Sequence, residues 1–240
     1  MTKTLMVYPA GKICEDFLRV CLKSRKSLYD EIDAVLQKGE TNARSCVLDK
    51  RLSSIESVYG RDDVMLLVTC EKERYLTIRD ELIAAGWEEF KDFKWYKFVD
   101  RKVCLINANC HGPVLERYLN MQKPFTDVYA VHPFMAQAQY MKNGMHTPLD
   151  DNLIHHVDLL LYQHMLPDNI MSPTYSDENV LQKVKSDCQC VSIPNFYPLG
   201  GGFTRRRQWK SSRDMELMML DFIKINYWTG RFSNVQQKTS

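Results

Sequence analysis

Strand-like and helix-like patterns alternate along the first hundred residues. The apolar run Thr4–Tyr8 is typical of a strand, and Pro9-Ala10-Gly11 follows it as a turn. Apolar residues then recur at helical spacing from Ile13 to Leu22. A further strand is predicted at 63–69, followed by a helix at 75–85. This order predicts a small parallel α/β layer.

A shorter apolar segment, Cys46–Leu48, is predicted as another strand of this layer, ending at Asp49. An acidic residue at such a strand end can bind a ribose, but aspartate is more often a turn former there. Dinucleotide-binding turns carry the pattern G-x-G-x-x-G, and residues 8–13 supply one of its glycines, Gly11. We therefore favour a domain kept for packing or for holding a partner over one that binds a nucleotide.

The second part of the chain has a more regular pattern. Its apolar runs predict four strands, at 102–107, 127–131, 157–162 and 190–193. A helix is predicted at 113–120, beginning with a proline that suits the first helical turn, and another at 215–227. These elements predict a second parallel α/β domain. We place the boundary near residues 97–102, with domains at 1–98 and 99–240.

Composition narrows the class of protein. The chain has 240 residues, of which 45% are hydrophobic and 26% charged, so it can bury a core. Its 32 basic and 30 acidic residues give a net charge of +2 and no reason to expect binding to nucleic acid or to an anionic membrane. The apolar runs are shorter than the roughly 20 residues of a membrane span. We expect a cytoplasmic protein whose eight cysteines are free thiols.

Polar residues follow every predicted strand of the second domain, and all six histidines lie after residue 110. Parallel α/β sheets bind ligands at the carboxyl ends of their strands, so the chemistry is expected there. The segments concerned are 107–113, 132–134, 163–165 and 194–202.

Cys110 is the strongest candidate nucleophile. It precedes a predicted helix, whose free N–H groups and dipole stabilise a thiolate or a bound anion. The alternative is that this thiol only packs beneath the helix. His111 can serve as its base only if the turn brings the ring round, and His132 and His164 are the other candidate bases. The Gln163 amide can stabilise an oxyanion.

A basic loop and a cysteine pair complete the candidates. Three glycines at 200–202 are followed by a run of basic side chains, a pattern that fits either a phosphate-rich cofactor or a solvated loop. Cys188 and Cys190 are separated by one residue, which is closer than in zinc sites, and His155 and His156 precede a strand and are expected to be structural. No metal is predicted.

Residues 102–210 resemble the WcbI family of polysaccharide-biosynthesis acetyltransferases. The resemblance rests on the order of three segments: Asn109-Cys110-His111-Gly112, then Val157–Gln163, then Val191–Tyr197. It implies an SGNH-like three-layer α/β domain with a parallel sheet and an active site at Cys110 and His111. Residues 1–98 loosely resemble the Rossmann-like domains fused to glycan-modifying enzymes.

This resemblance implies a coenzyme A-dependent O-acyltransferase, most simply an acetyltransferase, that modifies a sugar hydroxyl in capsular or surface polysaccharide biosynthesis. Acetyl coenzyme A is then the cosubstrate, and a glycan or sugar nucleotide is the acceptor. A homo-oligomer is left open. The residues expected to bind the cofactor are Asn109, Gly112, Gly201, Arg205, Arg206, Arg207 and Lys210.

The chain departs from the SGNH pattern in one respect. SGNH hydrolases take their catalytic histidine from a late Asp-x-x-His, and no histidine follows His164 here. The base is therefore expected to be one of the histidines up to His164, or to come from a continuation beyond Ser240. Two other functions fit the same residues: an SGNH-like carbohydrate esterase that needs no coenzyme A, and a non-catalytic binding or scaffold protein.

Overall fold

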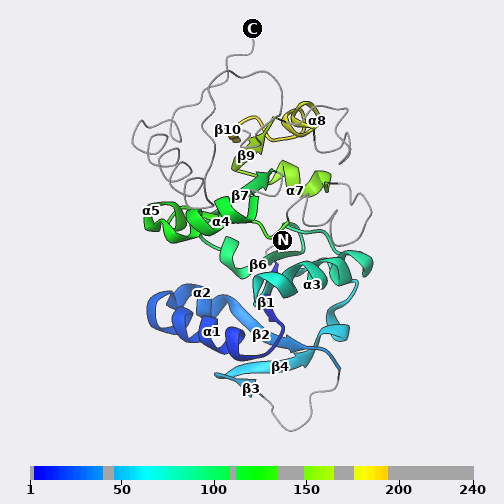
Figure 1. Ribbon diagram of the computed structural model, residues 1–240. Coiled ribbons are helices and arrows are strands. Elements are labelled where there is room, and N and C mark those ends of the chain that lie inside the picture. Colours follow the sequence, from blue (N-terminus) through cyan, green and yellow to red (C-terminus); the bar gives the residue numbers. More distant parts are fainter. Residues whose placement is uncertain (1–2, 40–45, 109–111, 135–148, 165–175, 194–240) are drawn as a thin grey trace, which may run out of the picture. The chain divides into compact units, whose positions relative to one another are not determined.

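The computed structural model describes residues 3–39, 46–108, 112–134, 149–164 and 176–193 (Figure 1). The chain divides into two compact units, Met1–Asp100 and Arg101–Ser240. The division lies between Asp100 and Arg101, and the sequence places it near residues 97–102. Both units combine helices with mainly parallel strands, which confirms the general α/β prediction.

The first unit contains a six-stranded sheet in the order β3-β4-β2-β1-β5-β6. All neighbouring strands are parallel except β3 and β4. The strands are β1 (Thr4–Tyr8), β2 (Ile32–Gln37), β3 (Cys46–Val47), β4 (Lys50–Ser54), β5 (Val64–Val68) and β6 (Phe93–Trp95). The helices are α1 (Lys12–Ser24), α2 (Lys26–Glu31) and α3 (Lys72–Ala84), with short 3₁₀ turns η1 (Ile55–Val58) and η2 (Tyr96–Phe98).

Helix α1 packs on the sheet through one apolar stripe. The buried side chains on this helix are Cys14, Phe17, Leu18 and Cys21, a spacing of three and four residues that keeps them on one face. They share a core with Val7 and Val35 of the central strands. The strand alternation then directs Tyr8 to the opposite face of the sheet.

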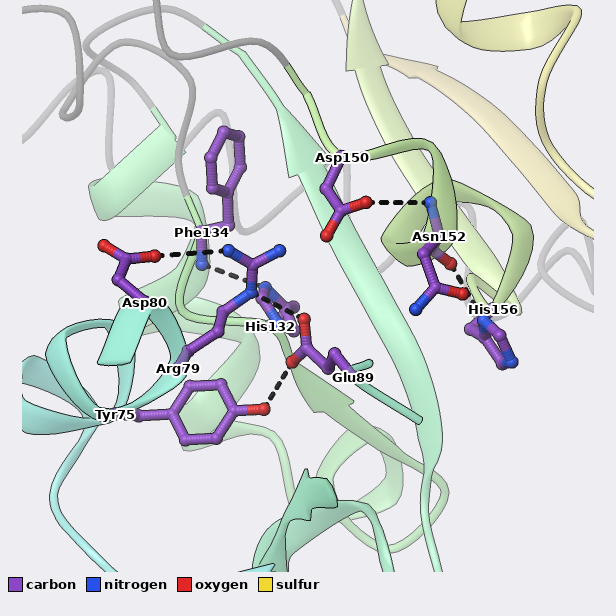
Figure 2. A network of polar contacts seen from close by, with 9 residues as sticks. All are labelled: Tyr75, Arg79, Asp80, Glu89, His132, Phe134, Asp150, Asn152 and His156. Atoms are coloured by element: carbon purple, nitrogen blue, oxygen red, sulfur yellow. Dashed lines mark hydrogen bonds and ion pairs between the residues drawn. The ribbon is translucent and has the colours of Figure 1, made fainter. Parts of the chain in front are cut away.

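A buried ion pair lies in the interior of the first unit (Figure 2). The Glu89 carboxylate, in a residue that is 1% exposed, accepts a hydrogen bond from Arg79 Nε at 2.6 Å and another from the Tyr75 hydroxyl. Burial and the charge of Glu89 hold the pKa of Tyr75 well above its ordinary value, so the phenol stays a donor. The network joins α3 to the segment that precedes β6.

One expectation for the first unit is wrong, and its strands β2, β4 and β6 are absent from the prediction. Cys46–Leu48 does not form a parallel strand of the layer, because β3 pairs antiparallel with β4. Leu48 and Asp49 make the tight turn between them, with φ of 45° and 64°, so Asp49 is a turn residue. Strand β2 is absent from the prediction because the exposed Asp33 interrupts its apolar run.

The described part of the second unit contains a four-stranded parallel sheet in the order β10-β9-β7-β8. Its strands are β7 (Lys102–Asn107), β8 (Tyr129–Val131), β9 (Leu159–Gln163) and β10 (Gln189–Ile193). The helices are α4 (Gly112–Met121), α5 (Lys123–Thr126), α7 (Asp151–His155) and α8 (Asp177–Leu181). The predicted strands lie within about two residues of these bounds. The helix predicted at 215–227 lies outside the described residues.

Helices α4 and α5 cover one face of this sheet. Leu115 and Leu119 of α4 and Phe125 of α5 pack in one core with alternate residues of the strands, among them Ile106 and Leu161. Nearly continuous apolar strands suit a parallel sheet that is covered on both faces. The core therefore fixes which strand residues point towards α4.

Asp158 joins the starts of three strands in the second unit. Its carboxylate accepts a hydrogen bond from the Val103 amide at 2.7 Å and lies 2.5 Å from Lys185 Nζ. Its own amide donates to Val103 O at 2.9 Å, and its carbonyl accepts from the Gln189 amide at 2.9 Å. One side chain and its backbone thus hold the amino ends of β7, β9 and β10 in register.

Replacing Asp158 by alanine should lower the free energy of unfolding by about 2 kcal/mol, because the Val103 amide and the Lys185 ammonium lose a charged acceptor. Asp187→Ala is the matched control, since Asp187 is 79% exposed and lies 4.0 Å from the same Lys185. The control should change stability by less than about 0.5 kcal/mol. Urea denaturation measures both, and equal effects of the two variants contradict the role given to Asp158.

Within the described residues, every helix is too short or too polar to cross a membrane.

Candidate functional site

Polar side chains lie at the carboxyl edge of the second unit's sheet. Numbered along the chain, its strands are arranged 2-1-3-4, so the connections after β7 and β9 leave in opposite directions. Ligands bind at such a divergence in open α/β sheets. Asn107 and Gln163 are the last residues of β7 and β9, and they are 2% and 1% exposed. Two buried amides therefore flank this point.

Strand alternation places these amides on opposite faces of the sheet. Ile106 and Leu161 belong to the core beneath α4. Gln163, two residues after Leu161, shares that face, whereas Asn107 follows Ile106 and lies on the other. His132 follows Val131, which is also in the α4 core, so it lies on the same face as Asn107. The structure thus brings His132 to the face of Asn107 and separates it from Gln163.

His132 is completely buried at the end of β8 (Figure 2). Its backbone amide donates to Cys104 O at 2.7 Å, and its ring Nδ1 accepts from the Phe134 amide at 3.0 Å. A neutral ring that accepts at Nδ1 carries its proton on Nε2, so it has no second lone pair to offer. In this arrangement the His132 ring holds the loop after β8 through its hydrogen bond with the Phe134 amide. That hydrogen bond must break before Nδ1 can accept a proton from a substrate.

His164 follows β9 directly and is exposed. Of the two candidate histidines that the structure describes, it is the one that a hydroxyl from solvent can reach. The third candidate, His111, lies outside the described residues. Exposure therefore favours His164 over His132 as a base.

The candidate nucleophile lies in the short segment 109–111, outside the described residues, as do Asn109 and His111. The residues on either side are described: Ala108 is buried after β7, and Gly112 is the buried first residue of α4. Four residues, 108–111, therefore separate the last residue of β7 from the first residue of the ten-residue helix α4. Gly201, Arg205, Arg206, Arg207 and Lys210 also lie outside the described residues.

Glu116 is a buried acid that the sequence interpretation missed. It is buried on α4 among Gly112, Leu115 and Leu119, which recur at spacings of three and four residues. A charged residue at a position that helical spacing directs inward is the signal that could have identified it. Burial, and after it the Glu116 charge, strongly raises the pKa of the nearby Cys104 thiol. Cys104 is therefore held protonated and is no candidate nucleophile.

Two further histidines lie at the end of α7: His155 is its last residue, and His156 (Figure 2) follows it, whereas His146 lies outside the described residues. Asp150 caps this helix by accepting from the Asn152 amide at 2.9 Å. His155 Nδ1 lies 2.6 Å from Asp151 O, and His156 Nδ1 lies 2.8 Å from Asn152 O. Both rings contact the helix's own carbonyls, as a structural role requires. Across the described ranges, no three His, Cys, Asp or Glu side chains gather closely enough to hold a metal ion.

The two buried amides lie on opposite faces of the sheet, so a single ligand cannot contact both of them. Gln163 lies on the face that α4 covers, and an amide there can stabilise a carbonyl oxygen that becomes negative when water is excluded. Known proteins offer no guide to its ligand: no protein-family model matches the chain, nor does any curated protein or solved structure.

Replacing His132 by leucine should lower the free energy of unfolding by about 2 kcal/mol, because the buried Phe134 amide loses its acceptor. His164→Leu is the control at an exposed position and should change stability by less than about 0.5 kcal/mol. Guanidinium denaturation of the two variants tests this. A stable His132→Leu protein would show that the ring does not hold the loop.

Proposed function

We propose that the second unit is a coenzyme A-dependent O-acyltransferase, most simply an acetyltransferase, acting on a sugar hydroxyl of a surface polysaccharide precursor. The supporting observation is the position of Asn107 and Gln163 at the ends of the two central strands, with Asn107 two residues before the segment 109–111 that carries Cys110 and leads into α4. A glycan or a sugar nucleotide is the acceptor. The enzyme acts in the cytoplasm, where acetyl coenzyme A is available.

In the first of two mechanisms, the Cys110 thiolate attacks the thioester carbonyl of acetyl coenzyme A. The C–S bond to coenzyme A breaks, and its thiolate takes up a proton. A sugar hydroxyl then attacks the acyl-cysteine while a histidine accepts the hydroxyl proton, and the Cys110 thiolate leaves. Exchange of one thioester for another is nearly neutral in free energy, so the covalent route carries little thermodynamic cost.

In the second mechanism the sugar hydroxyl attacks acetyl coenzyme A directly. The base is then His111 or His164, since His132 already accepts a hydrogen bond at Nδ1. In both mechanisms the Gln163 amide and the N–H groups at the start of α4 stabilise the oxyanion. The basic residues 205–210 hold the phosphates of coenzyme A, with Gly201 allowing the backbone to approach them.

Strand order supports the finer fold assignments. The parallel strands of the first unit follow the order 3-2-1-4-5, which is found in Rossmann folds. The second unit follows the flavodoxin-like order 2-1-3-4. We therefore assign a Rossmann-like first domain, which packs or holds a partner, and an SGNH-like second domain.

Acetyl coenzyme A at about 100 times its dissociation constant should stabilise the protein by roughly 2.7 kcal/mol. Thermal unfolding with and without the ligand measures this, and replacing Arg205, Arg206 and Arg207 by glutamine should abolish the shift. No shift with either coenzyme A or its acetyl ester would overturn the acyltransferase. Glycan deacylation without coenzyme A would then identify the esterase, and the absence of both activities would favour a scaffold.

Replacing Cys110 by alanine should reduce acetyl transfer about 1,000-fold if the covalent mechanism holds, because the nucleophile is lost. Gln163→Leu should reduce kcat about 100-fold through loss of an oxyanion donor. Cys46→Ala is the control, because Cys46 is an exposed thiol in the first unit. Transfer of radiolabelled acetyl groups to a glycan acceptor measures all three. Substantial activity of Cys110→Ala would leave only the direct mechanism.

A further inference from the structure

Two cysteines lie side by side at the start of β10. Cys190 is the second residue of that strand, and Cys188 precedes the strand by one residue. Residues two apart on extended chain point to the same face. Cys188 is 7% exposed and Cys190 is half-buried, and both are free thiols. This pair takes no part in the proposed acyl transfer.

Each sulfur atom lies near a backbone carbonyl oxygen of Cys188 or Gln189. Cys188 Sγ lies 3.7 Å from Gln189 O, and Cys190 Sγ lies 3.8 Å from Cys188 O. The neighbouring Cys188 thiol lowers the pKa of Cys190, and the neighbouring Cys190 thiol raises the pKa of Cys188. Cys190 is also the more exposed of the two thiols, so it is the one that a reactant from solvent meets first.

The other described cysteines lack this combination. Burial raises the pKa of Cys14 to about 11 and that of Cys70 to about 12, and Cys21 and Cys104 are completely buried. Cys46 is exposed, but it lies in the hairpin of the first unit, where no second thiol is adjacent among the described residues. Reactivity in thiol exchange needs both an accessible thiolate and a partner that resolves the product.

We propose that Cys188 and Cys190 form a thiol–disulfide exchange site whose reactant is a low-molecular-weight disulfide such as oxidised glutathione. The Cys190 thiolate attacks one sulfur of oxidised glutathione and forms a mixed disulfide, and one glutathione thiolate leaves. Cys188 loses its proton and attacks the Cys190 sulfur, which releases the second glutathione as a thiol. The two cysteines are oxidised to a disulfide, and one glutathione disulfide is reduced to two thiols.

The backbone makes this disulfide easy to reverse. Two residues of extended strand separate Cα atoms by about 6.6 Å. This is near the upper limit, about 6.8 Å, of the Cα separations seen in disulfides. A bond formed there carries strain, and strained disulfides are readily reduced. The pair therefore responds to the ratio of oxidised to reduced glutathione and does not act as a permanent crosslink.

The test treats the full-length native protein with oxidised glutathione, blocks the remaining thiols by alkylation and maps its tryptic peptides by mass spectrometry. Cleavage after Lys185 and Arg205 yields a peptide that holds Cys188 and Cys190 and no other cysteine. After oxidation this peptide should be lighter than its reduced form by the mass of two hydrogens. It should carry no alkyl group, because no thiol remains to react. Adding reduced glutathione should restore both thiols.

Serine variants distinguish the roles of the two thiols. Cys188→Ser should stop at a glutathione adduct on Cys190, whereas Cys190→Ser should leave Cys188 largely unmodified. Cys46→Ser is the control and should still form the disulfide. The proposal fails if both cysteines of the wild-type peptide remain thiols. It also fails if the peptide carries a glutathione adduct but no disulfide forms between Cys188 and Cys190. This peptide map of the wild-type protein decides the question even if a serine variant does not fold.

Discussion

The position of β7 between β8 and β9 is the constraint on which the second unit depends. Parallel pairing on both sides buries every residue of this strand after Lys102. It also brings the carboxyl ends of three strands to one edge. Asp158 supports the same pairing from the other edge, where a single carboxylate meets the Val103 amide and the Lys185 ammonium. The polar edge thus follows from the parallel pairing of these apolar strands.

The sequence predicts this sheet well because its strands are nearly continuous apolar runs. Such runs have few alternatives to a covered parallel strand. The first unit was harder to predict, because β2 contains the exposed Asp33, and because the Leu48-Asp49 turn reverses the chain instead of ending a parallel strand. Local patterns identify a strand, but its direction and partner depend on contacts that are distant in sequence.

The candidate site was predictable as a set of loops, not as an arrangement of side chains. Gln163 and His132 both follow apolar runs, yet strand register places them on opposite faces of the sheet. A shift of one residue would exchange those faces, and no local pattern fixes the register that closely. Glu116 was missed for a related reason: its burial follows from the way α4 packs, and its residue type argues against it.

The buried network of Tyr75, Arg79 and Glu89 also limits how the first unit can vary in evolution. Losing Glu89 removes the buried carboxylate that Arg79 Nε binds, and losing Arg79 removes that charged donor from Glu89, whereas replacing the set by apolar side chains of similar volume removes the desolvation cost of the pair. The effects of changes at these positions are therefore strongly non-additive. Positions on α3 and in the segment before β6, although ten or more residues apart, are expected to change together or not at all.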